Sequence, residues 1–170
     1  SAVGIRSVGE FNAASVRGDL SQIIRVSEGF QEKRVGAIAD AIADLSPRVK
    51  VVAVAGPSSS GKTTFIKRLR VQLQVNGVTP IGLSLGDYYC DREKTPRDPE
   101  GQYDYEAFGA LRHDVLRDHL VRVLRGEAVK TAHYDFLSGR CHPDGGPEIR
   151  LGAKDILMVE GIHGLNPELL

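Results

Sequence analysis

The chain has 170 residues, 41% of them hydrophobic, which suits one domain with a single core and is small for two. Lys plus Arg and Asp plus Glu both number 22, so the net charge is zero and no overall field favours nucleic acid or an anionic membrane. No window approaches the roughly 18 apolar residues of a membrane span, and the N-terminus lacks the pattern of a signal peptide. We therefore expect a soluble, cytoplasmic protein in which any anion binding is local.

The two cysteines, Cys90 and Cys141, are too few for a disulfide framework. Their spacing from His133 and His142 matches no zinc-binding pattern. The sequence predicts two free thiols in a reducing compartment.

The N-terminal part of the chain divides into two segments. Residues 1–18 are small and polar and predict a loose arm. Residues 19–46 carry apolar stripes at helical spacing, with Asp19 as a candidate N-cap, and predict a helical lead-in. Residues 47–170 then form the main predicted domain.

Three short apolar runs in the main domain predict strands, at residues 49–55, 81–85 and 155–159. Helical periodicity separates them at residues 62–76 and 106–125. Alternating strands and helices predict an α/β fold, with a mostly parallel sheet covered on both faces.

Ligands of such sheets bind at the carboxyl ends of the strands. Here these ends are Gly56, Gly86 and Glu160, so the sequence predicts that the three lie side by side.

A glycine-rich turn follows the first predicted strand and matches G-x-x-x-x-G-K-[ST]. Its position between a strand and a helix is the one in which backbone N–H groups and the helix N-terminus surround phosphate oxygens. Lys62 would bring a cation to the outer phosphates, and Thr63 a hydroxyl to Mg²⁺. The predicted nucleotide-binding residues are Gly56, Pro57, Ser58, Ser59, Ser60, Gly61, Lys62, Thr63 and Thr64.

Glu160 follows the third apolar strand directly. A carboxylate at the end of a strand that neighbours the phosphate turn can reach the shell of a bound metal, so Glu160 is a second candidate ligand of Mg²⁺. The alternative is a solvated loop glutamate.

Several motifs in a fixed order resemble the uridine kinase and phosphoribulokinase group of P-loop kinases, over about residues 20–170. They read AGPSSSGKTTFIKRL, SLGDYYCDREKTPRD, GQYDYE, GEAVKTAHYDFLSGR and VEGIHGLNPEL. The chain is most similar to the long bacterial uridine kinase-like proteins. The resemblance implies a P-loop three-layer sandwich that uses ATP and Mg²⁺ to phosphorylate the 5′-hydroxyl of a nucleoside.

The resemblance also implies a catalytic carboxylate directly after the second strand, in a pattern like S-x-D-[DS]-[FY]-Y. This sequence has Gly86 at the expected position of the base, followed by Asp87. Neighbouring side chains of extended chain point to opposite sides, although glycine permits backbone angles that could turn Asp87 inward. Asp87 is thus the candidate base, together with Lys62 as a catalytic residue, and the alternative is a weakened kinase or a regulatory module that binds nucleotide.

Three further residues match substrate-binding positions of the family. Asp104 resembles the aspartate that binds the ribose hydroxyls, or is a helix N-terminal acid. Tyr134 resembles the tyrosine at the nucleobase, or is a core aromatic, and Arg140 faces either an anionic substrate group or solvent. The base-contacting histidine of uridine kinases is matched by Gly139, which leaves the acceptor open, with a sugar phosphate or pantothenate as alternatives.

Members of the family continue past the third strand with an arginine-bearing lid and further strands. We therefore expect the lid and the later strands to lie outside this sequence. The predicted partners are a nucleotide and a small-molecule acceptor, without nucleic acid or membrane, and a homo-oligomer is left open.

Overall fold

The computed structural model describes residues 4–169 and centres on a parallel sheet of three strands. These are β1 (Val51–Val54), β7 (Asp155–Glu160) and β2 (Thr79–Ser84), in the spatial order β1-β7-β2. The register places both Val54 and Ser84 opposite Glu160. The three carboxyl ends therefore lie together at one edge of the sheet, as the sequence predicts.

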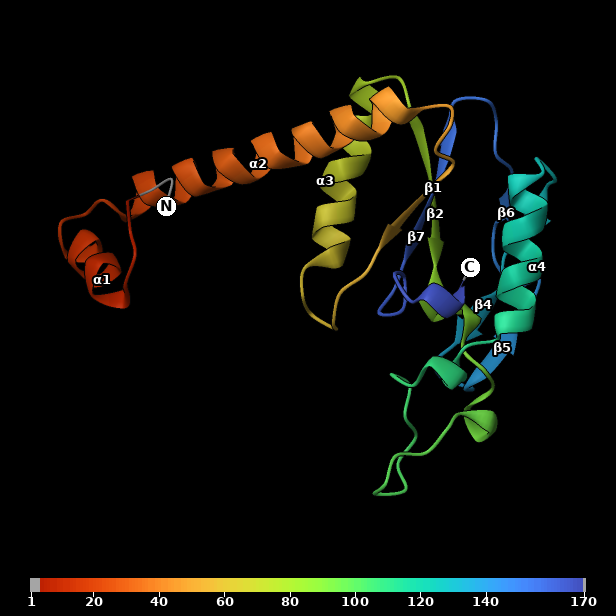
Figure 1. Ribbon diagram of the computed structural model, residues 1–170. Coiled ribbons are helices and arrows are strands. Elements are labelled where there is room, and N and C mark those ends of the chain that lie inside the picture. The colour runs from red at the N-terminus through yellow and green to blue at the C-terminus, as the bar shows by residue number, and fades with distance from the viewer. Residues whose placement is uncertain (1–3, 170) are drawn as a thin grey trace.

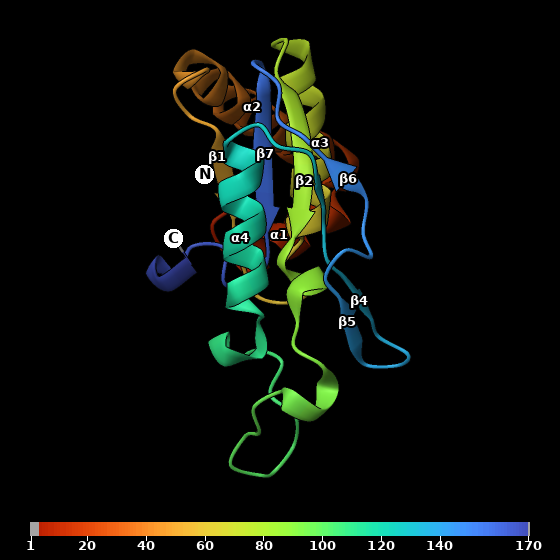
Figure 2. The ribbon, with the colours of Figure 1, turned by 90° about the vertical axis from the view of Figure 1, so that its right-hand side faces the viewer.

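Helices cover both faces of the sheet (Figures 1 and 2). One face is covered by α3 (Lys62–Val75) and by the C-terminal part of α2 (Leu20–Leu45), and the other by α4 (His113–Leu124). This arrangement of helix, sheet and helix confirms the predicted three-layer α/β fold.

The alternation of side chains along β7 divides the core in two. Ile156 and Met158 pack in the cluster that includes Val35 of α2 and Leu69 of α3. On the opposite face of β7, Leu157 lies in the cluster that contains residues of α4, β2 and the chain after β2. All four residues of β7 between its ends are buried, because the strand is central and covered on both sides.

The N-terminal segment is more helical than its composition predicts. Residues 8–16 form α1 (Val8–Val16) where a loose arm was expected, and residues 1–3 lie outside the described part. The Ser7 hydroxyl accepts a hydrogen bond from the backbone N–H of Glu10, which matches the spacing of a capping box. Asp19 is the N-cap residue of α2, as predicted, but its side chain pairs with Arg17 at 3.0 Å and makes no capping hydrogen bond.

Helix α4 begins seven residues later than the predicted start at residue 106. Leu111 adopts extended backbone angles and forms a bridge with Tyr89, and the N–H of Arg112 donates to the carbonyl of Tyr88 at 2.7 Å. Pairing with the chain after β2 thus overrides the helical periodicity of residues 106–112, where only a 3₁₀ turn, η3 (Phe108–Ala110), forms.

The remaining elements are short. The antiparallel pairs are β3 (Val129–Lys130) with β6 (Glu148–Ile149), and β4 (His133–Asp135) with β5 (Arg140–His142). The other 3₁₀ turns are η1 (Leu85–Tyr88), η2 (Arg92–Lys94) and η4 (Pro167–Leu169).

A buried polar pair ties the chain after β2 to α4. The Tyr88 hydroxyl lies 3.1 Å from Nδ1 of His119, and both residues are buried. Burial lowers the pKa of His119, because the charged imidazolium is poorly solvated there, despite the opposing effect of Asp118 and Asp144.

We expect the stability of the fold to decrease on mild acidification because of His119. As pH falls below about 6.5, the unfolded chain binds a proton that the folded protein resists, so the free energy of unfolding falls until the lowered pKa is passed. Urea denaturation between pH 7.5 and 5 checks this, and His119→Gln should flatten the slope in that range. An equal slope in the variant would contradict the prediction.

The two cysteines form no disulfide: Cys90 is half-buried and Cys141 is buried, both as free thiols. Within residues 4–169, no helix is long and apolar enough to cross a membrane.

Candidate functional site

The glycine-rich turn between β1 and α3, which is the predicted phosphate loop, contains two residues with positive φ. Ser59 and Gly61 both have positive φ, at 59° and 88°, which turns the chain back on itself before α3 begins at Lys62. A Cβ on Gly56 would lie 2.9 Å from the Ser60 hydroxyl, so a larger residue there would require the Ser60 side chain to move. The Lys62 ammonium donates to the carbonyl of Pro57 at 2.7 Å, across the loop.

Two pockets adjoin this loop. A pocket of about 550 Å³ is lined by residues of the loop, β1 and α3, with Gln31 of α2. A second pocket, of about 160 Å³, lies at the carboxyl ends of the strands and is called here the strand-end pocket. It is lined by Lys62, Thr63, Ser84, Leu85, Gly86, Tyr89, Leu111, Glu160, Gly161, Ile162 and His163.

The strand-end pocket joins predicted residues from three separate parts of the chain. Lys62 and Thr63 come from the start of α3, Gly86 from the turn after β2, and Glu160 from the end of β7. The topology of the sheet accounts for this convergence. Each segment lies at the carboxyl end of a parallel strand or in the chain that follows it, and parallel strands place these ends at the same edge of the sheet.

Thr63 and Glu160 offer the oxygen atoms that Mg²⁺ prefers. Within residues 4–169 there is no group of three or more His, Cys, Asp or Glu side chains that could hold a metal by themselves. The donor set therefore fits a magnesium ion that takes most of its ligands from phosphate oxygens and water, as in nucleotide sites.

Asp87, the predicted base, is not among the residues that line the strand-end pocket. Its carboxylate lies 3.3 Å from Nδ1 of His133 and accepts the backbone N–H of Tyr134 at 3.4 Å. The side chain thus joins η1 to β4. The strand-end pocket thus contains Lys62 but not Asp87, and a catalytic role for Asp87 stays a prediction.

Asp104 accepts two backbone N–H groups through a single carboxylate oxygen. The donors are Glu106 at 2.9 Å and Ala107 at 3.0 Å. This is a local turn of the chain, which corresponds to the alternative that the sequence left open, although no helix begins there. The second oxygen has no hydrogen bond within the described residues, so binding of ribose hydroxyls stays a prediction.

Tyr134 is only 1% exposed, and its ring packs edge-to-face against Tyr89 and Phe136. Burial raises the pKa of Tyr134 to about 12, with a further contribution from the neighbouring Tyr105 hydroxyl. The structure therefore shows a core aromatic. Stacking of a nucleobase on this ring would require Tyr89 or Phe136 to move.

Gly139 belongs to a contact that the sequence does not reveal. Its φ is +70°, and a Cβ on it would lie 2.8 Å from the guanidinium carbon of Arg92. Arg92 also donates to the Phe136 carbonyl at 2.7 Å and to the Tyr105 hydroxyl at 3.3 Å. Arg92 thus occupies the space of a side chain at position 139, while Arg140 is exposed on β5 and its role stays a prediction.

His163 is the residue of the strand-end pocket to which the sequence assigns no definite role. It follows Glu160 by three residues, and its ring packs edge-to-face against Phe108 with centroids 5.3 Å apart. The signal for it was its place in Gly-Ile-His-Gly, directly after a predicted strand end.

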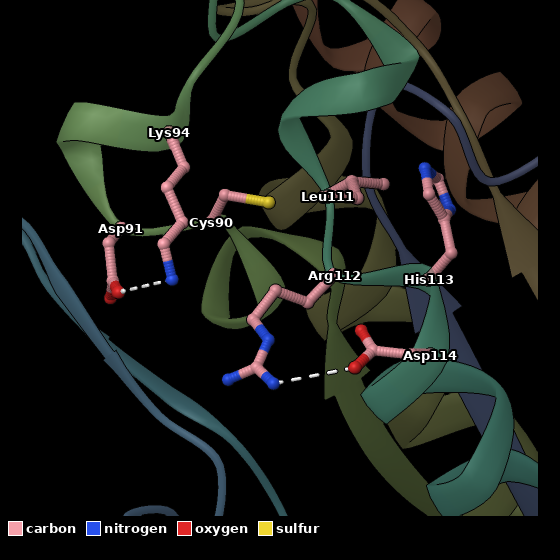
Figure 3. A pocket seen from close by; sticks show the side chains of 7 residues that line it. All are labelled: Cys90, Asp91, Lys94, Leu111, Arg112, His113 and Asp114. Carbon is pink, nitrogen blue, oxygen red and sulfur yellow. Dashed lines mark hydrogen bonds and ion pairs between the residues drawn. The ribbon is translucent and has the colours of Figure 1, made fainter.

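A pocket of about 430 Å³ lies on the other side of the chain after β2, between η2 and the start of α4 (Figure 3). Lys94 pairs with Asp91 at 3.6 Å, and Arg112 pairs with Asp114 at 3.4 Å. Each cation is thus matched by a carboxylate, and none of the predicted site residues lines this pocket. Burial raises the pKa of the Cys90 thiol, which makes it a poor nucleophile.

Comparison with known proteins agrees with this geometry. Residues 51–169 match the Phosphoribulokinase / Uridine kinase family. A uridine kinase of Brevibacillus brevis is 32% identical over 118 residues, which are 69% of this chain and 53% of that protein. A uridine kinase of Anoxybacillus flavithermus is 31% identical over 120 residues, covering 71% and 54% of the two chains.

Among solved structures, a possible uridine kinase from Bacillus stearothermophilus superposes with a TM-score of 0.64 at 22% identity, covering 81% of this chain and 74% of that one. This likeness supports the fold. The chain spans about half the length of the curated relatives it matches. The match over residues 51–169, the phosphate loop and the parallel sheet together show that the chain belongs to the phosphoribulokinase/uridine kinase family of kinases.

Proposed function

We propose that the protein of which this chain is part transfers the γ-phosphoryl group of ATP to the 5′-hydroxyl of a nucleoside, assisted by Mg²⁺. The observation that carries the proposal is the strand-end pocket, which joins the phosphate loop to the ends of β2 and β7. The names of the curated relatives support a nucleoside as the acceptor.

Phosphoryl transfer depends mainly on positioning and on stabilisation of negative charge. In this proposal the loop residues 56–64 hold the phosphates through backbone N–H groups, and Lys62 neutralises the outer phosphates. Thr63 and Glu160 would hold Mg²⁺, directly or through water, and the metal would offset negative charge on the phosphates. Asp104 and Arg140 remain candidates for contacts with the acceptor.

A second candidate function is a regulatory module that binds nucleotide without transferring phosphate. Two observations favour it: Gly86 brings no side chain to the strand-end pocket, and Asp87 is bonded to β4. A third candidate, phosphorylation of another small alcohol, uses the same residues.

Turnover by the full-length protein separates these functions. We expect acceptor-dependent formation of ADP when ATP and Mg²⁺ are combined with a nucleoside, and not with pantothenate or a pentose phosphate. The nucleoside product should carry phosphate at the 5′ position. A parent protein that binds ATP but turns over no acceptor, with activity gained in Gly86→Asp, would instead support the regulatory module.

A further inference from the structure

Transfer to a hydroxyl requires a group that accepts its proton, within hydrogen-bond reach of the acceptor oxygen. Gly86 lies in the strand-end pocket but has no side chain, and the Asp87 carboxylate is bonded to β4 outside that pocket. The titratable side chains that line the pocket are Lys62, Tyr89, Glu160 and His163.

Three of these four are poorly suited to accept the proton. Lys62 bonds to the loop carbonyl of Pro57 and carries the charge that phosphate needs. Tyr89 has a raised pKa because of burial, so its hydroxyl stays protonated and has no strong base to offer. Glu160 is the carboxylate in this pocket that suits Mg²⁺.

His163 has both the position and a free hydrogen-bonding group. Its Nε2 is buried, and within residues 4–169 it has no hydrogen-bond partner. Unpaired buried polar atoms are rare in native proteins, and a catalytic role or a bound water or ion is among the explanations for them. The ring packs edge-to-face against Phe108, with centroids 5.3 Å apart.

We infer that His163 accepts the proton of the acceptor hydroxyl, in the role that a carboxylate at position 86 would have. The inference rests on the proposed phosphoryl transfer. The acceptor O–H bond breaks and its oxygen forms a bond to the γ-phosphorus, while the bond between this phosphorus and the bridging oxygen breaks. ADP leaves with that electron pair, and the proton passes to a ring nitrogen of His163 and then to water.

Two charged side chains line the strand-end pocket together with His163. Lys62 and Glu160 face the same pocket, from α3 and β7, and His113 lies beyond Phe108, with its ring 4.1 Å from that of Phe108.

The test compares four forms of the full-length protein: wild type, His163→Asn, Gly86→Asp and the double variant. We expect His163→Asn to lower kcat by about 100- to 10,000-fold, the range for a lost general base, with KM for ATP changed less than threefold. The kcat of the double variant should be at least tenfold higher than that of His163→Asn. Because carboxylates protonate at lower pH than imidazoles, its activity should also persist to lower pH than that of the wild type.

His142→Asn is the matched control, since His142 is exposed on β5 and does not line the strand-end pocket, and it should keep activity within about threefold. Asp87→Asn tests the competing base. Thermal midpoints measured with and without ATP show whether each variant folds. If His163→Asn does not fold, the comparison of the pH profiles of Gly86→Asp and the wild type tests the inference instead.

Three outcomes would overturn the role of His163. These are an active His163→Asn protein, a large loss in Asp87→Asn with none in His163→Asn, or a pH profile unchanged by Gly86→Asp. A wild-type protein that turns over no acceptor would overturn the proposed function as well, and it is recognised before any variant is made.

Discussion

Replacing Lys62 with alanine should lower the rate of phosphoryl transfer about 100- to 1,000-fold, the loss seen when one charge-stabilising group is removed from a transition state. Lys62 is the first residue of α3 and lines both pockets that adjoin the phosphate loop. Its ammonium already lies across the loop, bonded to Pro57, so it needs only a local movement to reach a phosphate. Steady-state kinetics with ATP and the preferred nucleoside measure the effect.

Lys67→Ala is the control for this experiment. Lys67 lies on the same helix but is exposed and lines none of the pockets described, so its loss should leave kcat within about twofold. Thermal midpoints should be similar for the two variants. If Lys62→Ala retained wild-type kcat, the phosphate loop would not be the site of the reaction.

The second large effect concerns stability. Leu157→Ala should lower the free energy of unfolding by about 2–5 kcal/mol, because truncation of a buried leucine leaves a cavity in addition to the lost burial. Leu157 is fully buried on the central strand and pairs with Val51 on one side and Ile81 on the other. Urea denaturation measures the loss as a lower midpoint at an unchanged slope.

Leu137→Ala is the matched control, because Leu137 is 94% exposed on the β4–β5 turn and should change stability by less than about 0.5 kcal/mol. Equal midpoints for the two variants would mean that β7 is not the centre of the core. A lower slope for Leu157→Ala would instead indicate a change in the compactness of the unfolded or folded state.

The central sheet and the phosphate loop could be predicted because each depends on a short local pattern. Continuous apolar runs identify strands buried on both faces, and the loop between residues 56 and 64 has fixed spacing in the context of a strand and a helix. The parallel topology then places Glu160 beside Lys62 without further information.

The errors arise where long-range pairing decides the structure. The helical pattern from residue 106 is interrupted because Leu111 pairs with Tyr89, a contact between segments 22 positions apart. The direction of the Asp87 side chain is set by β4, more than 40 residues later in the sequence. The exclusion of any side chain at Gly139 by Arg92 likewise depends on packing that no local pattern reports.

Helix α2 is part of the folded domain, although it lies before the match to the family model. The family match starts at residue 51, yet Val35 and Ala39 of α2 are buried in the core that α2 shares with α3 and β7. A recombinant fragment cut at the family boundary would leave Leu69 and Leu73 facing water and invite aggregation. The folded domain thus includes residues that precede the match to the family model.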